Sequence, residues 1–376
     1  MMEKITKINS ITLDEKGEEF CLGHDHGIKT FNLENFKEEN NSNNIEFILG
    51  NISLAHYFPE NEDLIVFIGS KDNKDYPPYN LVFFDITEKK IILNKKFDRE
   101  ISNFKCASNF VIITFGSSLI IYSYDKNKNE LEQKEEHNIE KNSLFECWIE
   151  KQQDIINNLY LAYPKEKELI IVHYKIYEWE YGNKLNIQSP VSSIQNLFYV
   201  KKINQIFISD EQAKYIYGFD IDDGKKKLCL KRGTNPGFIT SIALLNDGKF
   251  LAVNNLDRTI HIFDLDIKNN AFSLKNMFLG IFSDMVEIYP RLRIYYQNIL
   301  ENMEGLFFQN NFAKKGAVLF SDNDDELIII AYNGFAFKIK INFKELSYKV
   351  VLKEEYVEKK MKNMSLYTSG LEGSDE

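Results

Sequence analysis

His24, Asp25 and His26 form the turn GHDHG, the part of the sequence whose residue types come closest to a metal site. Imidazole and carboxylate groups are ordinary zinc ligands, and a stable site needs three or four of them in a suitable spacing. The two histidines stand only two positions apart, and the neighbouring sequence offers no third ligand of their kind. A plain polar turn is the better interpretation, so we expect no metal.

Motifs of nucleophilic catalysis are also lacking in the sequence, because no Ser/His/Asp or Cys/His arrangement falls in a recognisable motif. The glycines at 23–27 and 69 do not have the spacing of a phosphate-binding loop. The four cysteines are too far apart for a zinc motif, which indicates reduced, buried thiols. We therefore expect a protein that is not an enzyme and that needs no cofactor.

A basic run, KKLCLKRG at 226–233, is the strongest local candidate for binding an anion. The whole chain has 46 basic and 56 acidic residues, a net charge of −10. General nucleic-acid binders are normally basic, so any anion recognition must be local, and we expect no nucleic-acid partner. The alternative for the run is a solvated strand at the edge of a sheet.

The elements that must position these residues are short. Apolar or alternating runs of 4–8 residues, such as LIVFIGS, FVIITFG and TIHIFDL, recur between polar turns, and this is strand length. An aromatic or apolar residue near the end of a strand recurs at spacings of 53, 38, 50, 47, 44 and 76. These landmark residues are Phe31, Phe84, Tyr122, Val172, Phe219, Phe263 and Ile339.

The spacing is typical of a four-stranded propeller blade, which takes about 40–45 residues. Seven landmarks predict an all-β, seven-bladed β-propeller of the WD-repeat type, a single domain over 1–358. The long last spacing predicts an insertion in blade six at about 266–305. We also expect the strand around Ile5–Ile8 to pair beside the last blade, and the polar, acidic tail at 359–376 to be disordered.

The first ten residues, MMEKITKINS, contain no apolar core of a signal peptide, and no stretch reaches 18 apolar residues. These features predict a soluble, cytoplasmic protein.

Four motifs in order resemble one family, the PROPPINs, which are seven-bladed phosphoinositide-binding propellers of autophagy. LKRGT at 230–234 resembles the family's arginine doublet, and FLAVNNLDRTIHIFDL at 250–265 resembles its blade six. LAYP at 161–164 and GSKDNKDYPPYNLVFFD at 69–85 resemble its blades four and two. The resemblance extends from about residue 17 to 350.

The resemblance implies two lipid pockets that bind phosphatidylinositol 3-phosphate or the 3,5-bisphosphate. Forked cationic donors and small hydroxyls suit a phosphate. In blade six, Arg258 replaces a glycine, and Asn254 and Asn255 replace hydroxyl residues of the family. The implied blade-six set is Arg232, Thr234, Asn254, Asn255, Arg258, Thr259 and His261. Thr259 and His261 are alternatively strand residues that complete a turn.

The blade-five pocket departs further from the family. Lys231 replaces the first arginine and loses its planar fork, and Lys214 replaces a threonine. Asp210 and Tyr217 stand where the family has a serine and an arginine, and a carboxylate repels a phosphate. Of this pocket we expect only Lys231 and Lys214 to contribute.

The insertion resembles the long blade-six loop of the family, which enters the bilayer interface. It contains a dense apolar cluster beside arginines, as interfacial segments do. The cluster consists of Phe272, Leu274, Met277, Phe278, Leu279, Ile281 and Phe282. The alternative is that this segment packs back onto its own propeller.

The resemblance thus implies a non-enzymatic adaptor, peripheral on autophagic or endolysosomal membranes, that binds a 3-phosphoinositide and recruits protein partners. Blades two and three, with the loop Lys71–Pro78 and the strand region 100–122, would engage the large lipid-transfer protein of autophagy. The alternative is a scaffold of PROPPIN shape that has lost specific lipid binding. A propeller subunit of an RNA-modifying complex is disfavoured by the negative charge.

Overall fold

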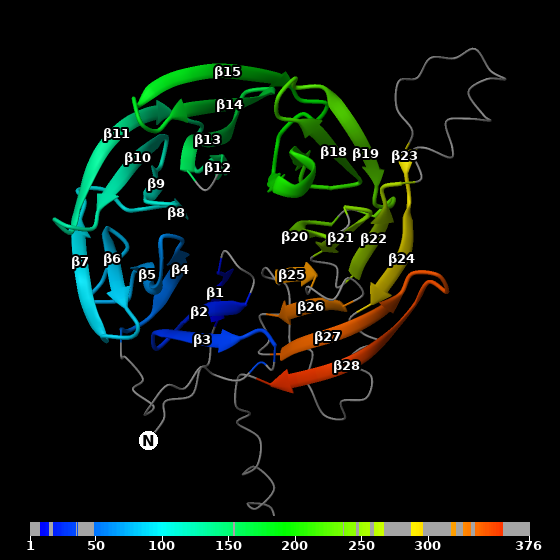
Figure 1. Ribbon diagram of the computed structural model, residues 1–376, viewed down its shortest axis with the longest axis horizontal. Coiled ribbons are helices and arrows are strands. Elements are labelled where there is room, and N and C mark those ends of the chain that lie inside the picture. Colours follow the sequence, from blue (N-terminus) through cyan, green and yellow to red (C-terminus); the bar gives the residue numbers. More distant parts are fainter. Residues whose placement is uncertain are drawn as a thin grey trace, which may run out of the picture.

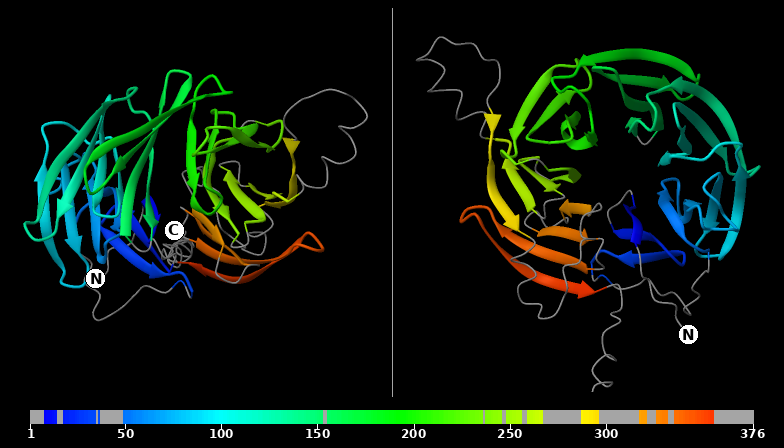
Figure 2. Two further views of the ribbon diagram at one scale, coloured as in Figure 1. Left: turned by 45° about the horizontal axis from the view of Figure 1, so that its top comes forward. Right: turned by 180° about the vertical axis from the view of Figure 1, so that it is seen from behind.

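The structure is a computed structural model that describes residues 8–14, 18–34, 36, 49–152, 155–235, 237–245, 248–255, 259–266, 287–295, 317–320, 326–331 and 335–355. Seven antiparallel sheets stand around a common centre and form a ring (Figures 1 and 2). This arrangement confirms the predicted seven-bladed propeller. The one helical element in the described residues is a single 3-10 turn at Lys201–Ile203.

Most blades have four strands, and each blade is one contiguous stretch of chain except that the short strand β23 (Glu287–Ile288) adds to the fifth blade. Blade one contains β1 (Ile8–Leu13), β2 (Glu19–His24) and β3 (Ile28–Asn32). Blade two contains β4 (Ile52–Phe58), β5 (Asn61–Gly69), β6 (Asn80–Asp85) and β7 (Lys90–Lys96). Blade three contains β8 (Asn103–Ala107), β9 (Phe110–Phe115), β10 (Ser118–Asp125) and β11 (Glu130–Asn138).

The fourth and fifth blades contain β12 (Glu146–Gln152), β13 (Ile155–Lys165), β14 (Glu168–Lys175), β15 (Glu180–Gln188); and β16 (Asn196–Val200), β17 (Gln205–Ser209), β18 (Tyr215–Asp220), β19 (Lys226–Lys231). The last two contain β20 (Ile239–Leu244), β21 (Phe250–Asn255), β22 (Thr259–Asp264), β24 (Pro290–Tyr295); and β25 (Ala317–Phe320), β26 (Glu326–Ala331), β27 (Phe335–Asn342), β28 (Ser347–Glu355).

All seven landmark residues lie on the third strand of their blade. Such strands are buried on both faces, because each blade is packed between two neighbours; β10, for example, is buried at six of its eight positions. The buried side chains gather between consecutive blades, as where Phe83 of blade two meets Ile113 of blade three. The periodic signal therefore came from third-strand residues that are buried in all seven blades.

The first blade differs from expectation. Ile8 pairs with His24 inside the first sheet, so β1 is the innermost strand of blade one and does not join the last blade. Residues 5–7 lie outside the described part. Among the described residues, blade one has three strands, and it packs on blade seven through side chains such as Leu22 and Ile330.

In blade six, β22 ends at Asp264, one residue after Phe263, where the insertion is predicted to begin. Its fourth strand, β24, follows only at Pro290, and it pairs with β22. Residues 287–295, which fall within the expected insertion, therefore belong to the propeller. The apolar cluster at 272–282 lies outside the described residues, as does the tail at 359–376.

Candidate functional site

Arg232 directly follows β19, and its side chain is buried, with 2% of its surface exposed. Its Nε donates to the carbonyl oxygen of Ala213 at 2.9 Å, and its Nη2 donates to the carbonyls of Gln212, at 3.3 Å, and Asn235. The guanidinium thus binds backbone oxygens of two connections, the β17–β18 loop and the segment that leads into β20. In this geometry it clamps two loops together.

The surroundings of Arg232 are tight. Its backbone N–H donates to the carbonyl of Lys214 at 2.9 Å. A Cβ added at Gly237 would lie 2.8–3.0 Å from the guanidinium, whereas one added at Gly233 would meet nothing within 4 Å. The clamp therefore depends on the absence of a side chain at 237.

Lys231 has a different environment. Its ammonium lies 5.4 Å from the centre of the Tyr215 ring and 5.3 Å from that of Tyr289. Both distances fit cation–π attraction. Tyr215 is the cross-strand neighbour of Lys231, and Tyr289 lies between β23 (Glu287–Ile288) and β24. The first position of the doublet is therefore held between two phenol rings.

Lys214, the other residue predicted for the blade-five pocket, has a half-buried side chain. Thr234 of the predicted blade-six set is exposed on the connection after Arg232. The Asp210 carboxylate accepts the Ala213 N–H at 2.8 Å within its own turn. Asp210 therefore stabilises the loop that Arg232 clamps.

In blade six, Asn254, Asn255, Thr259 and His261 are buried where β21 leads into β22. The Nδ2 of Asn255 contacts the Nδ1 of His261 at 2.9 Å and donates to the carbonyl of Thr259 at 3.1 Å. The Asn255 side chain thus links the end of β21 to the start of β22. Ile239 pairs with Asn255, which joins this turn to the end of the clamped connection. Arg258 lies outside the described residues.

The strand β23 joins blade five to blade six. Its two residues pair in parallel with Cys229 and Leu230 of β19, so they add a fifth strand to blade five. Ile288 is 2% exposed and packs in the apolar cluster between the two blades. Beside it, Arg291 of β24 forms an ion pair with Asp264 at 2.8 Å. The chain that returns from the insertion is thereby anchored beside the doublet.

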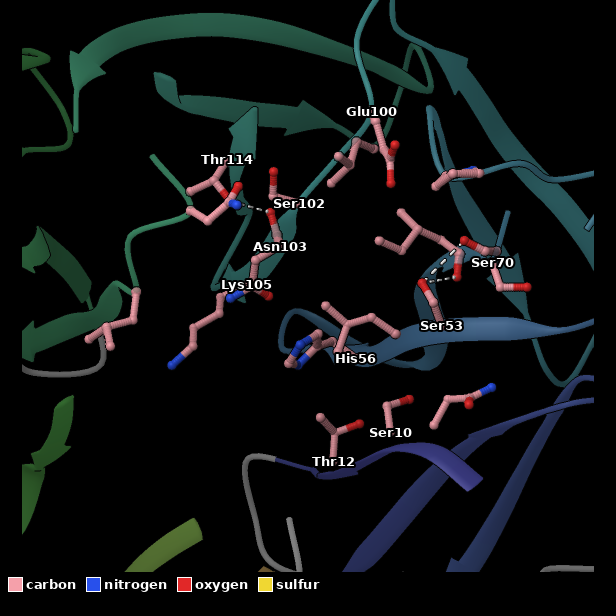
Figure 3. A pocket seen from close by; sticks show the side chains of 18 of the residues that line it. Ser10, Thr12, Ser53, His56, Ser70, Glu100, Ser102, Asn103, Lys105 and Thr114 are labelled. Atoms are coloured by element: carbon pink, nitrogen blue, oxygen red, sulfur yellow. Dashed lines mark hydrogen bonds between the residues drawn. The ribbon is translucent and has the colours of Figure 1, made fainter. Parts of the chain in front are cut away.

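A pocket of about 860 Å³ lies at the inner strands of the ring and is lined mainly by hydroxyl and amide side chains. Figure 3 shows Lys105 of β8 and His56 of β4 directed into the same space, with Ser10 and Thr12 of β1 below them. Thr12 Oγ1 donates to the Ala55 carbonyl at 2.6 Å, and Ser10 Oγ accepts the Ala55 N–H at 3.1 Å.

Part of this polar lining therefore forms hydrogen bonds to the backbone of a neighbouring inner strand. The Lys105 ammonium is 2.6 Å from Oε1 of Glu146, an ion pair that joins blades three and four. Sequence reasoning missed this pocket, although polar residues near the start of several inner strands, such as Ser53 and Asn103, were a usable signal. The arrangement suits hydrogen bonding and carries little net charge.

The expected polar turn at His24 is present. His24 is buried, and its Nδ1 accepts the His26 N–H at 3.1 Å. Burial lowers the pKa of His24 to about 4. Among the described residues, no three His, Cys, Asp or Glu side chains are grouped so as to hold a metal ion. All four cysteines are free thiols.

Several solved structures superpose on this chain. Hsv2 of Kluyveromyces lactis superposes with a TM-score of 0.69 at 14% identity, over 93% of this chain and 99% of that one. Hsv2 of Kluyveromyces marxianus gives a TM-score of 0.67 at 11% identity, over 93% and 99%. KlAtg21, solved with the coiled-coil of AgAtg16, gives 0.64 at 15% identity, over 93% and 100%. The resemblance to the PROPPIN propellers is thus confirmed at the level of the fold.

The sequence match to a curated protein is local. Autophagy-related protein 18 of Kluyveromyces lactis is 35% identical over 68 residues, which is 18% of this chain and 13% of that protein. No protein-family model matches the chain. In the described part, no helix is both long and apolar enough to span a bilayer.

Proposed function

We propose that this chain is a non-enzymatic, autophagy-related adaptor, which binds membranes carrying a 3-phosphorylated inositol lipid and recruits protein partners to them. The proposal rests on the pair Lys231–Arg232 at the end of blade five, with Thr234 exposed beside it, in a propeller shared with Hsv2 and Atg21. The lipid is phosphatidylinositol 3-phosphate or the 3,5-bisphosphate, and the protein is peripheral on autophagic or endolysosomal membranes.

The phosphate approaches through the connection that contains Thr234, which is the exposed end of the clamp. There it takes the place of the Asn235 carbonyl as acceptor for Arg232. An ionised phosphate is a stronger acceptor than a neutral carbonyl, and this difference drives the exchange. The cluster of Asn254, Asn255, Thr259 and His261 is linked to this connection through the pairing of Ile239 with Asn255. In this proposal Lys214 and Arg258 contribute positive charge to the site.

Protein partners bind through blades two and three in this proposal. The loop Lys71–Pro78 is fixed to the start of blade three by an ion pair between Lys71 and Glu100 at 3.1 Å. Tyr79 beside it is 37% exposed. This surface is the candidate site for the large lipid-transfer protein of autophagy, and a pull-down with Lys71→Glu and Tyr79→Ser variants tests it.

A second candidate function is favoured by one observation. The donors of Arg232 serve backbone carbonyls, and Lys231 lies between two rings. A scaffold of PROPPIN shape without specific lipid binding would have this same geometry. The two functions differ in a single measurable property, the preference for the 3-phosphate.

Vesicle flotation decides between them. Vesicles with phosphatidylinositol 3-phosphate are compared with vesicles holding the same fraction of the 4-phosphate, which has equal charge. The adaptor floats preferentially with the 3-phosphate, and Thr234→Ala and Arg232→Lys reduce that preference about tenfold, since a charge-assisted bond contributes about 1.5–3 kcal/mol. Equal flotation with both lipids overturns the proposal and supports the scaffold. Melting temperatures of both variants separate lost binding from lost folding.

A further inference from the structure

We propose that the pocket at the inner strands binds an uncharged sugar in the form of a short oligosaccharide. We call it the inner-strand pocket; its volume is about 860 Å³, and its lining includes Thr12 of blade one, Ser53 of blade two, and Asn103 and Lys105 of blade three (Figure 3). The inference goes beyond the proposed function, because it involves no phosphate and does not use the Lys231–Arg232 pair.

The first argument is the balance of charge. The lining contains two lysines and no arginine. The Lys71 ammonium is 3.1 Å from a carboxylate oxygen of Glu100, and the Lys105 ammonium is 2.6 Å from one of Glu146. Each positive charge is therefore neutralised, and the chain as a whole carries −10. An uncharged ligand suits this lining better than a phosphate or a carboxylate does.

The second argument is the kind of polar group. Of the 23 lining residues, nine carry a hydroxyl group and three carry a side-chain amide. Hydroxyl and amide groups both donate and accept hydrogen bonds. Each hydroxyl of a sugar does the same, whereas an ionised phosphate only accepts and an ammonium group only donates. The lining therefore complements a molecule that carries many hydroxyl groups.

The third argument is the hydrogen-bonding capacity that is left for a ligand. Asn103 and Lys105 are two positions apart on β8, so their side chains lie on the same face of the strand. In the part of the chain that the structure describes, the side-chain amide of Asn103 has no hydrogen-bond partner; its backbone carbonyl accepts from Thr114 Oγ1 at 3.2 Å. The Lys105 ammonium uses one of its three N–H groups for Oε1 of Glu146. A donor and an acceptor therefore stand side by side, which fits two neighbouring hydroxyls of a sugar ring.

The fourth argument is the size of the pocket and the rest of its lining. The volume of about 860 Å³ falls within the range of small-molecule sites, about 300–1,000 Å³. Leu54, Ile101 and Leu144 stand among the polar groups and suit the C–H groups of a sugar ring. None of the 23 lining residues is Phe, Tyr or Trp, so the pocket lacks the ring on which a flat aromatic ligand such as a nucleobase stacks. A sugar therefore fits the pocket better than a nucleotide does.

Saturation-transfer NMR on the full chain tests the pocket, with maltotriose, cellobiose, mannobiose and N,N′-diacetylchitobiose as probes. Each is present at about 10 mM, and we expect at least one to bind with a Kd of about 1 mM or tighter. Asn103→Ala weakens this binding about threefold to tenfold, because one neutral hydrogen bond contributes about that factor. Lys105→Met combined with Glu146→Gln weakens it about tenfold or more, without leaving an unpaired charge.

Asn183→Ala is the matched control, because it removes an exposed amide on β15, outside the pocket. Its binding should equal that of the wild type, and melting temperatures of all variants separate lost binding from lost folding. No saturation transfer to any of the four sugars would overturn the proposal, as would equal losses in Asn103→Ala and Asn183→Ala. Tighter binding of glucose 6-phosphate than of glucose would also overturn it, because the pocket would then recognise charge.

The outcome is independent of the proposed function. Sugar binding that Asn103→Ala weakens supports the pocket, even if the wild type does not distinguish the 3-phosphate from the 4-phosphate in vesicles. Conversely, a clear 3-phosphate preference without binding of any sugar rejects the pocket and leaves the lipid adaptor intact. Asn103→Ala should also leave the 3-phosphate preference unchanged, because Asn103 belongs to blade three and the phosphate is proposed to bind at Arg232.

Discussion

Lys231 and Arg232 are consecutive in the chain, but their cationic groups lie in opposite environments. The ammonium of Lys231 lies between the rings of Tyr215 and Tyr289, next to solvent. The guanidinium of Arg232 is buried and donates to the carbonyl oxygens of Ala213 and Gln212. Alternation of side chains along an extended strand separates the two groups. They therefore make different contributions to stability and to binding.

Arg232→Ala should lower the free energy of unfolding by on the order of 3 kcal/mol, because buried carbonyls lose their donor at about 1–3 kcal/mol each. Lys231→Ala should cost about 1 kcal/mol or less, since an exposed cation–π contact contributes about 0.5–1 kcal/mol. Urea denaturation of both variants measures the difference. Equal midpoints would show that the clamp does not stabilise the fold.

Gly237→Ala should destabilise the protein, whereas Gly233→Ala should not. The added methyl at 237 would lie within 3.0 Å of the Arg232 guanidinium, and at 233 it would meet nothing within 4 Å. The expected cost at 237 is about 1–3 kcal/mol, the range for overpacking a tight site. Thermal melting of this matched pair is the measurement. A stable Gly237→Ala protein would mean that the guanidinium can leave its carbonyls easily.

Stability should fall as the pH drops below about 6.5, partly because of His137. Burial, together with the charge of Lys184, lowers the pKa of His137 to about 4. In the unfolded chain a histidine titrates near pH 6.5, so on acidification the unfolded state takes up the proton before the folded state does. The free energy of unfolding therefore decreases between pH 6.5 and 4. Because the ring is half-buried, the loss is on the order of 1 kcal/mol.

His137→Gln provides the comparison. Denaturant unfolding of wild type and variant at pH 7 and pH 5 should show a smaller loss for the variant, because glutamine does not titrate. Carboxylates affect both proteins alike and cancel in the difference. Parallel pH profiles would contradict the lowered pKa.

Phe278→Ser with Phe282→Ser tests the segment at 272–282, which lies outside the described residues. If the segment enters the bilayer interface, vesicle binding should weaken while the melting temperature stays nearly constant. If it packs on the propeller, the melting temperature should fall by several degrees, because each lost buried Phe costs about 3–5 kcal/mol. Membrane entry therefore predicts weaker vesicle binding at a constant melting temperature, whereas packing on the propeller predicts a lower melting temperature.

The fold was predictable because its signal repeats. Phe84, Tyr122 and Phe263 occupy the third strand of blades two, three and six, and burial between neighbouring blades demands an apolar or aromatic residue each time. The contacts of the doublet were not predictable in the same way. Tyr289 reaches Lys231 through β23, a strand of two residues that has no periodic pattern. The clamp around Arg232 depends on loop carbonyls, which every residue type provides.

The contiguity of the blades bears on how the protein is synthesised. In the described part, every antiparallel ladder joins strands of one continuous stretch, and the single long-range addition is β23 on β19. Most blades can therefore pair their strands soon after they leave the ribosome, since short loops close quickly. In blade six, β24 can pair with β22 only after residues 265–289 have also been synthesised. In the described residues blade one contains no strand from the C-terminal end of the chain, and its packing against blade seven can form only after blade seven has been synthesised.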